Sequence, residues 1–145
     1  MSTLRQLTPA QKWVIVLIAF TLSLALANLG KAVVALRYAV RLPDLSMTVS
    51  LDYLVVMGAF WFIAFCVSAV GLSRFRDWGR WAALASVTLY QGHVWINHLL
   101  FDASDYAHQT IPRNLLLSAL PLLLFWGSLS LPAVRRAFDG GEERL

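Results

Sequence analysis

Apolar residues occur along this chain in long continuous stretches rather than in short or alternating runs. Four such stretches cover residues 13–36, 51–72, 81–101 and 112–131. Each is close to the roughly 20 residues that an α-helix needs to cross a bilayer. Backbone groups in lipid must bond within their own segment, so these stretches predict helices, and the short connections predict antiparallel neighbours. The sequence therefore predicts an all-α integral membrane protein with four transmembrane helices in an up-down bundle.

This prediction assigns residues 1–145 to one domain that ends in a short solvated tail over residues 133–145. Small residues four positions apart let helix backbones approach closely in lipid. The steps of this kind are Ala19, Ser23 and Ala27 on the first stretch, Ala64 and Ser68 on the second, and Ala82 and Ser86 on the third. Pro121 cannot donate a backbone hydrogen bond, so we expect it to kink the fourth helix. Thr110 is the expected N-cap of that helix.

Composition agrees with a membrane location. Of the 145 residues, 59% are hydrophobic and 14% are charged, with a mean hydropathy of +0.64. A soluble domain has about 45–50% apolar and about 25% charged residues. This excludes a disordered chain and a typical soluble enzyme, and the basic residues form no clustered face for nucleic acid. The single cysteine, Cys66, lies in an apolar stretch, so the chain offers no intrachain disulfide and no thiolate cluster.

The positions of Lys and Arg predict the orientation, because cytoplasmic loops are enriched in both. One side collects Arg5, Lys12, Arg74, Arg76, Arg80, Arg135, Arg136 and Arg144, and the other Lys31, Arg37, Arg41 and Arg113. Both termini are therefore expected in the cytoplasm. Ala25-Leu26-Ala27 could mark a signal-peptide cleavage site, but the apolar stretch continues beyond it, which favours an uncleaved helix. The excess of Arg over Lys suggests a prokaryote, and hence a multi-pass protein of its inner membrane.

The third stretch differs from the others because polar residues cover about half of its circumference. At about 100° per residue, Gln91 and His98 fall on one stripe, and Tyr90, His93 and Asn97 on the stripe beside it. Polar groups in a membrane are costly and must face other protein. These five residues are the candidate ligand-binding set, for a haem, a quinone or another small molecule. The alternative interpretation is that they only form interhelical hydrogen bonds.

A metal site is a narrower hypothesis for the outer end of this stretch. If the helix continues outward, His98, Asp102, Asp105 and His108 stay on nearly one side. Imidazole and carboxylate are ligands for zinc, iron or manganese. The segment from Asp102 to Asp105 equally resembles a turn, which would destroy this register. The default expectation is that the chain carries no cofactor.

The connection between the second and third stretches is rich in Arg and Trp. Its members are Arg74, Arg76, Trp78, Arg80 and Trp81. Arg can reach lipid phosphates while Trp lies at headgroup depth, so these residues are expected to contact lipid headgroups. Membrane lipids are thus the first expected partner. Further partners would be other membrane subunits or a second copy of the chain, and nucleic acid is excluded.

The sequence supports three hypotheses for function. The first is a non-enzymatic accessory subunit or a self-associating bundle, supported by the small-residue steps and short loops. The second is a ligand-binding or redox-linked membrane protein that uses the polar face of the third helix for haem, quinone or metal. The third is a small transporter active only as an oligomer, disfavoured because one chain contains no inverted repeat. No nucleophile elbow or phosphate loop supports an enzyme.

Overall fold

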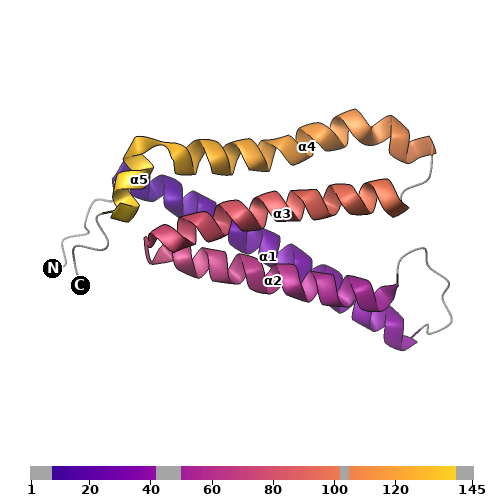
Figure 1. Ribbon diagram of the computed structural model, residues 1–145. Coiled ribbons are helices and arrows are strands. Elements are labelled where there is room, and N and C mark those ends of the chain that lie inside the picture. The colour runs from indigo at the N-terminus through magenta and orange to yellow at the C-terminus, as the bar shows by residue number, and fades with distance from the viewer. Residues whose placement is uncertain (1–7, 42–49, 102–104, 140–145) are drawn as a thin grey trace.

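The computed structural model describes residues 8–41, 50–101 and 105–139 and is built from helices, with no strand in those ranges. The helices are α1 (Pro9–Arg41), α2 (Leu51–Ser73), α3 (Asp77–Phe101), α4 (Asp105–Ser130) and α5 (Pro132–Asp139). Figure 1 shows the four long helices running side by side in alternating directions, with α5 turned across one end. The all-helical prediction is confirmed.

Two helices, α1 and α2, are each long and apolar enough to cross a membrane. The segments Leu115–Ser130 and Pro132–Phe138 together form a third candidate span that is bent by 68°. α3 has sufficient length but is interrupted by polar residues such as Gln91 and Asn97. The described chain therefore contains two or three candidate spans by length and composition, consistent with a membrane protein. The fourth span and the orientation remain predictions.

The pairing of α1 with α2 depends on a close backbone approach. Along α1, the buried residues are Val14, Leu17, Thr21, Ala25, Asn28, Ala32 and Ala35, which follow one face. A Cβ atom added at Gly58 of α2 would lie 2.9 Å from the Cβ of Ala32 and 2.9 Å from the carbonyl oxygen of Asn28. The predicted step of Ala19, Ser23 and Ala27 lies on the exposed side of α1. Small residues do form the contact face of α1, but they are Ala25, Ala32 and Ala35 and not the predicted ones.

A tight turn joins α2 to α3. A Cβ atom at Gly79 would overlap the backbone of Gly71, so both positions require glycine for this approach. Phe75 in the turn has a φ of 49°. Further along, the hydroxyl oxygens of Ser68 and Ser86 lie 3.0 Å apart. The predicted small-residue steps of α2 and α3 therefore do meet at these two serines.

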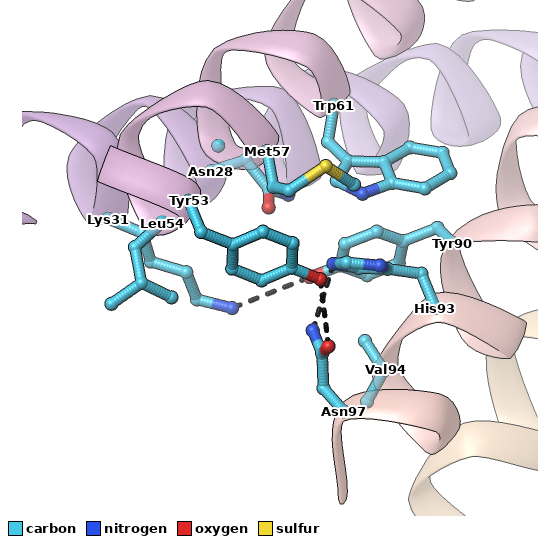
Figure 2. Close-up of a pocket in the computed structure, with 11 residues that line it drawn as sticks. Asn28, Lys31, Tyr53, Leu54, Met57, Trp61, Tyr90, His93, Val94 and Asn97 are labelled. Atoms are coloured by element: carbon cyan, nitrogen blue, oxygen red, sulfur yellow. Dashed lines mark hydrogen bonds between the residues drawn. The ribbon is translucent and has the colours of Figure 1, made fainter. Parts of the chain in front are cut away.

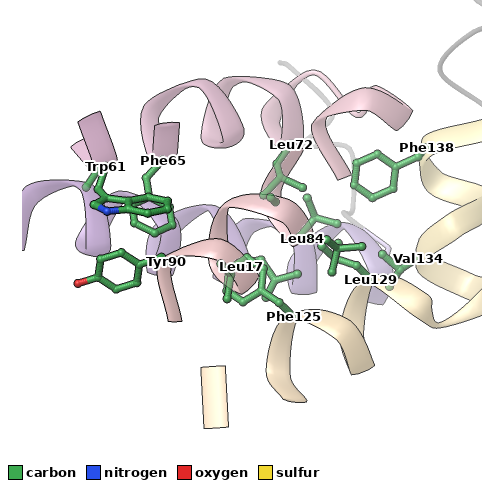
Figure 3. Close-up of a cluster of buried hydrophobic side chains, with 14 residues drawn as sticks. Leu17, Trp61, Phe65, Leu72, Leu84, Tyr90, Phe125, Leu129, Val134 and Phe138 are labelled. Atoms are coloured by element: carbon green, nitrogen blue, oxygen red, sulfur yellow. The ribbon is translucent and has the colours of Figure 1, made fainter. Parts of the chain in front are cut away.

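α4 joins the other helices through its second half. Phe125 and Leu129 are fully buried, in the cluster with Leu17 that Figure 3 shows. The rings of Phe125 and Phe20 are 5.9 Å apart. α4 is helical through Pro121, and the chain bends by 68° where α4 meets α5 at Leu131. α4 also begins at Asp105, so Thr110 lies inside the helix and is not its N-cap.

The short helix α5 occupies part of the predicted solvated tail. Val134 and Phe138 are 2% and 1% exposed, and the rings of Phe138 and Phe75 are 5.8 Å apart. Arg135 and Arg136 point to the exposed side. The segment departs from the prediction because its apolar residues recur four positions apart and form one buried face. Residues 140–145 lie outside the described part of the chain.

Candidate functional site

A cavity of about 110 Å³ lies among α1, α2 and α3. Figure 2 shows the side chains around it, which come from these three helices. Its lining residues with polar side-chain groups are Asn28, Lys31, Tyr53, Trp61, Tyr90, His93 and Asn97. Spacing along the helices explains how they converge, because Tyr53, Met57 and Trp61 are four residues apart on α2 and so share one face.

One wall of the cavity is a chain of hydrogen bonds between α2 and α3. The Tyr53 hydroxyl donates to Oδ1 of Asn97 at 2.9 Å, and Nδ2 of Asn97 lies 3.0 Å from Nε2 of His93. The amide nitrogen can only donate, so His93 must accept at Nε2. Its proton is therefore on Nδ1, and the imidazole is neutral. Figure 2 draws both bonds beneath the Tyr53 ring.

The opposite wall carries a charge. The Lys31 ammonium nitrogen lies 3.5 Å from the hydroxyl of Tyr90, to which it donates. Lys31 is itself exposed, whereas Tyr90 is buried. Among the described residues that line the cavity, Lys31 is the only charged one, and no carboxylate accompanies it. The cavity therefore has a net positive charge.

The indole of Trp61 adds a donor that has no partner. Trp61 is 5% exposed, and its Nε1 atom forms no hydrogen bond within the described part of the chain. Its ring meets those of Tyr90 at 5.2 Å and His93 at 5.7 Å. Figure 2 shows the indole nitrogen on the edge of the ring that faces the tyrosines. An unsatisfied buried donor costs about 1–3 kcal/mol, so this atom calls for an acceptor that the described part of the chain does not supply.

The structure brings together three of the five predicted ligand-binding residues. Tyr90, His93 and Asn97 line the cavity, while Gln91 and His98 do not. Gln91 is buried on the neighbouring face, and the ring of His98 packs at 5.6 Å against that of Trp95. The two predicted stripes thus have different surroundings, and the stripe of Tyr90, His93 and Asn97 is the one that lines the cavity.

Four polar lining residues were not in the predicted set: Asn28, Lys31, Tyr53 and Trp61. Asn28 and Lys31 lie on one face of α1, and this polar pair interrupts an apolar stretch. This polar pair could have indicated a site on α1, although it fits equally well with a lysine that anchors the helix at the membrane interface. Tyr53 and Trp61 gave no signal, because aromatic residues are common at helix ends and in cores.

Most of the predicted metal set falls outside the described side chains. α3 ends at Phe101 and α4 begins at Asp105, so His98 and Asp105 belong to different helices. Asp102 and the side chains of Asp105 and His108 lie outside the described residues. Within those that are described, no three His, Cys, Asp or Glu side chains are grouped as metal ligands.

The predicted headgroup residues lie at the turn between α2 and α3. Arg74 and Arg76 are exposed, and Trp78 and Trp81 are 44% and 54% exposed. Arg80 differs, because it is buried and pairs with Asp77 at 3.0 Å. Its guanidinium also lies 5.1 Å from the centre of the Trp81 ring. Arg80 therefore stabilises the start of α3, and the other four residues keep exposed surface at this turn.

Comparisons with protein families, curated proteins and solved structures find no match to this chain. Its class follows from the helices alone: an all-helical protein with apolar helices that can span a membrane.

Proposed function

We propose that this chain is a four-span protein of a prokaryotic inner membrane that binds a small ligand in the cavity among α1, α2 and α3. No catalytic role is included. The observation that carries the proposal is Trp61, a residue of the cavity lining whose buried Nε1 has no partner in the described chain. A ligand acceptor at this position would satisfy it.

The assignment of α3 as the fourth span rests on the division of its surface. Tyr90, His93 and Asn97 are directed to the cavity. Leu89, Ile96 and Leu99 are 65%, 57% and 73% exposed. A helix with its polar half against protein and its apolar half outward can lie in lipid, even though its mean hydropathy is modest.

Binding is favoured over catalysis by the roles that the polar groups already have. His93 accepts at Nε2 from Asn97, which leaves this nitrogen no capacity to take a proton from a substrate without breaking that bond. The described lining contains no carboxylate to orient an imidazole and no serine or cysteine to act as a nucleophile. The donors of the lining, such as the ammonium of Lys31, can instead bind a ligand through hydrogen bonds.

Cavity size limits the ligand. An engineered protein cavity of about 150 Å³ accommodates benzene. The present cavity, at about 110 Å³, suits a polar head of a few atoms and not an entire haem. A quinone would need the cavity to widen around its ring.

The test uses protein purified in detergent and a panel of probes: decanoate, decylubiquinone and hemin. At least one probe is expected to raise the melting temperature. The increase should disappear in the double variant Lys31→Met/Trp61→Phe. It should persist in Lys12→Met, which changes a lysine at the other end of α1. If no probe changes the melting temperature, and native mass spectrometry finds no bound molecule, the ligand-binding proposal is overturned.

A second candidate function is self-association, or docking to another membrane subunit. It is supported by the exposed small residues of α1: Ala19, Ser23 and Ala27. Exposed helix faces built from small residues permit close contacts between helices in lipid. Light scattering in detergent should then give a dimer or larger assembly for the natural chain and a monomer for Ser23→Leu. Leu26→Val, at a position that is 64% exposed, is the control. A monomeric natural chain would remove the self-association form of this candidate.

A further inference from the structure

We infer that the ligand of this cavity is the carboxylate head of an amphiphile, a fatty-acid-like anion whose tail remains in the lipid. The inference rests on the proposed function and specifies its ligand class. It follows from the donors in the lining, from the charge and size of the cavity, and from the apolar side chains at its edge.

Residues of α1, α2 and α3 contribute hydrogen-bond donors to the lining. The ammonium of Lys31 and the indole N–H of Trp61 both belong to it, on either side of Tyr90. Nδ1 of His93 carries a proton because Nε2 accepts from Asn97. A ligand with two oxygen acceptors therefore fits better than one with donors, such as an alcohol or an amine.

The charge favours an anion. Lys31 provides one positive charge, and no described residue of the lining balances it. A cationic head would be repelled, and a neutral carbonyl would leave the positive charge of the ammonium unbalanced. A monoanion neutralises the cavity. A carboxylate accepts a charge-assisted hydrogen bond from the ammonium, and its second oxygen remains to accept from another donor of the lining.

Size separates a carboxylate from a phospholipid head. A space of about 110 Å³ holds a carboxylate and its first methylene groups. A phosphodiester has substituents on both sides of the phosphorus and cannot enter to the same depth. The rim includes Leu54 and Val94, and Val94 is 37% exposed. Figure 2 shows both side chains at the periphery of the polar cluster, where an alkyl chain could leave toward lipid.

The experiment measures radiolabelled decanoate bound to the full chain in phosphatidylcholine nanodiscs at pH 8, against empty nanodiscs. Binding should be saturable. Lys31→Met should weaken it roughly tenfold or more, because a charged hydrogen bond is lost. Trp61→Phe should weaken it severalfold, since it removes only the N–H and part of the ring. Lys12→Met and Trp13→Phe are matched controls that should leave binding unchanged, and circular dichroism checks that each variant is folded.

Competition distinguishes the possible ligand chemistries. Decanol and decyltrimethylammonium should displace decanoate at least tenfold less well than unlabelled decanoate does. Equal displacement by decanol would overturn the requirement for an anion. Equal displacement by butanoate would show that a water-soluble carboxylate is sufficient and would overturn the amphiphile.

The same measurement separates this inference from the proposed function. Cavity-dependent binding of decylubiquinone without binding of decanoate would overturn the carboxylate and leave the ligand-binding function in place. If Lys31→Met binds decanoate as tightly as the natural chain, the site of the anion is not this cavity. Failure of every probe would overturn both.

Discussion

The hydroxyl of Tyr53 on α2 lies 2.9 Å from Oδ1 of Asn97 on α3, to which it donates a hydrogen bond. This bond orients the Asn97 amide, and the amide in turn fixes the proton of His93 on Nδ1. One tyrosine therefore controls which nitrogen of a histidine on another helix is a donor. It also ties α2 to α3 beside the cavity.

The first prediction concerns a substitution that removes this hydrogen bond. Tyr53→Phe keeps the ring but loses the hydroxyl, so it should lower the free energy of unfolding by about 0.6 kcal/mol and by no more than about 1.7 kcal/mol, the range for interhelical bonds in membranes. Asn97 is then able to turn, and nitrogen NMR of His93 should detect the Nε2–H tautomer. Tyr38→Phe, at an exposed position of α1, should change neither quantity. An unchanged tautomer in Tyr53→Phe would contradict this control of His93.

The second prediction concerns the contact between Gly71 and Gly79. Gly79→Ala would force a Cβ atom into the Gly71 backbone, so the turn between α2 and α3 must open. The expected cost is at least about 1–3 kcal/mol, as for other overpacked positions. Unfolding in detergent, followed by circular dichroism, measures it.

Gly92→Ala is the matched control on the same helix. A Cβ atom there meets nothing within 4 Å. Alanine is the better helix former by about 0.5–1 kcal/mol, so this change should be neutral or stabilising. Equal destabilisation by the two alanines would show that helix propensity, and not the approach of Gly71, controls position 79.

The stripe of Tyr90, His93 and Asn97 could be predicted from the sequence, because helix geometry alone places these residues on one face. Which neighbours they meet could not. The sequence gives two adjacent polar stripes on α3, and only the position of Gly58 against Ala32 decides how α1 presents Lys31 to one of them. Packing between helices determines which neighbour a polar face meets. The periodicity within one helix carries no information about that neighbour.

Helix contacts show the same limit. Ala19, Ser23 and Ala27 satisfy the four-residue spacing rule but are exposed, whereas Ala25 and Ala32, seven positions apart, are buried. The rule identifies residues that permit a close approach without selecting the face that is used. The bend at Leu131 was also missed. Pro121 removes one backbone hydrogen bond within α4, and the helix continues through it.

The third prediction tests the docking of α5. Phe138 is 1% exposed, and its ring lies 5.8 Å from that of Phe75. Phe138→Ala should lower the free energy of unfolding by about 3 kcal/mol, the low end for a buried phenylalanine. Hydrogen exchange over residues 132–139 should rise while α1 and α2 stay protected. Arg136→Ala, on the exposed side of α5, should leave exchange unchanged; a similar rise there would mean that burial of Phe138 does not hold the helix.

The fourth prediction concerns orientation in the membrane. The start of α1, the turn between α2 and α3, and α5 lie at one end of the helices in Figure 1. Exposed basic residues gather there: Lys12, Arg74, Arg76, Arg135 and Arg136. Basic residues near the ends of spans are retained in the cytoplasm, so this end should face inward.

Cysteine labelling checks this orientation in a Cys66→Ser background. A cysteine replacing Val40, which is 75% exposed at the opposite end of α1, should react with an impermeant maleimide in intact cells. A cysteine replacing Arg76 should react only after the membrane is permeabilised. The reverse pattern would invert the topology. Reaction of both in intact cells would show that α2 does not cross the membrane, since α2 separates the two positions, and would remove the four-span arrangement with it.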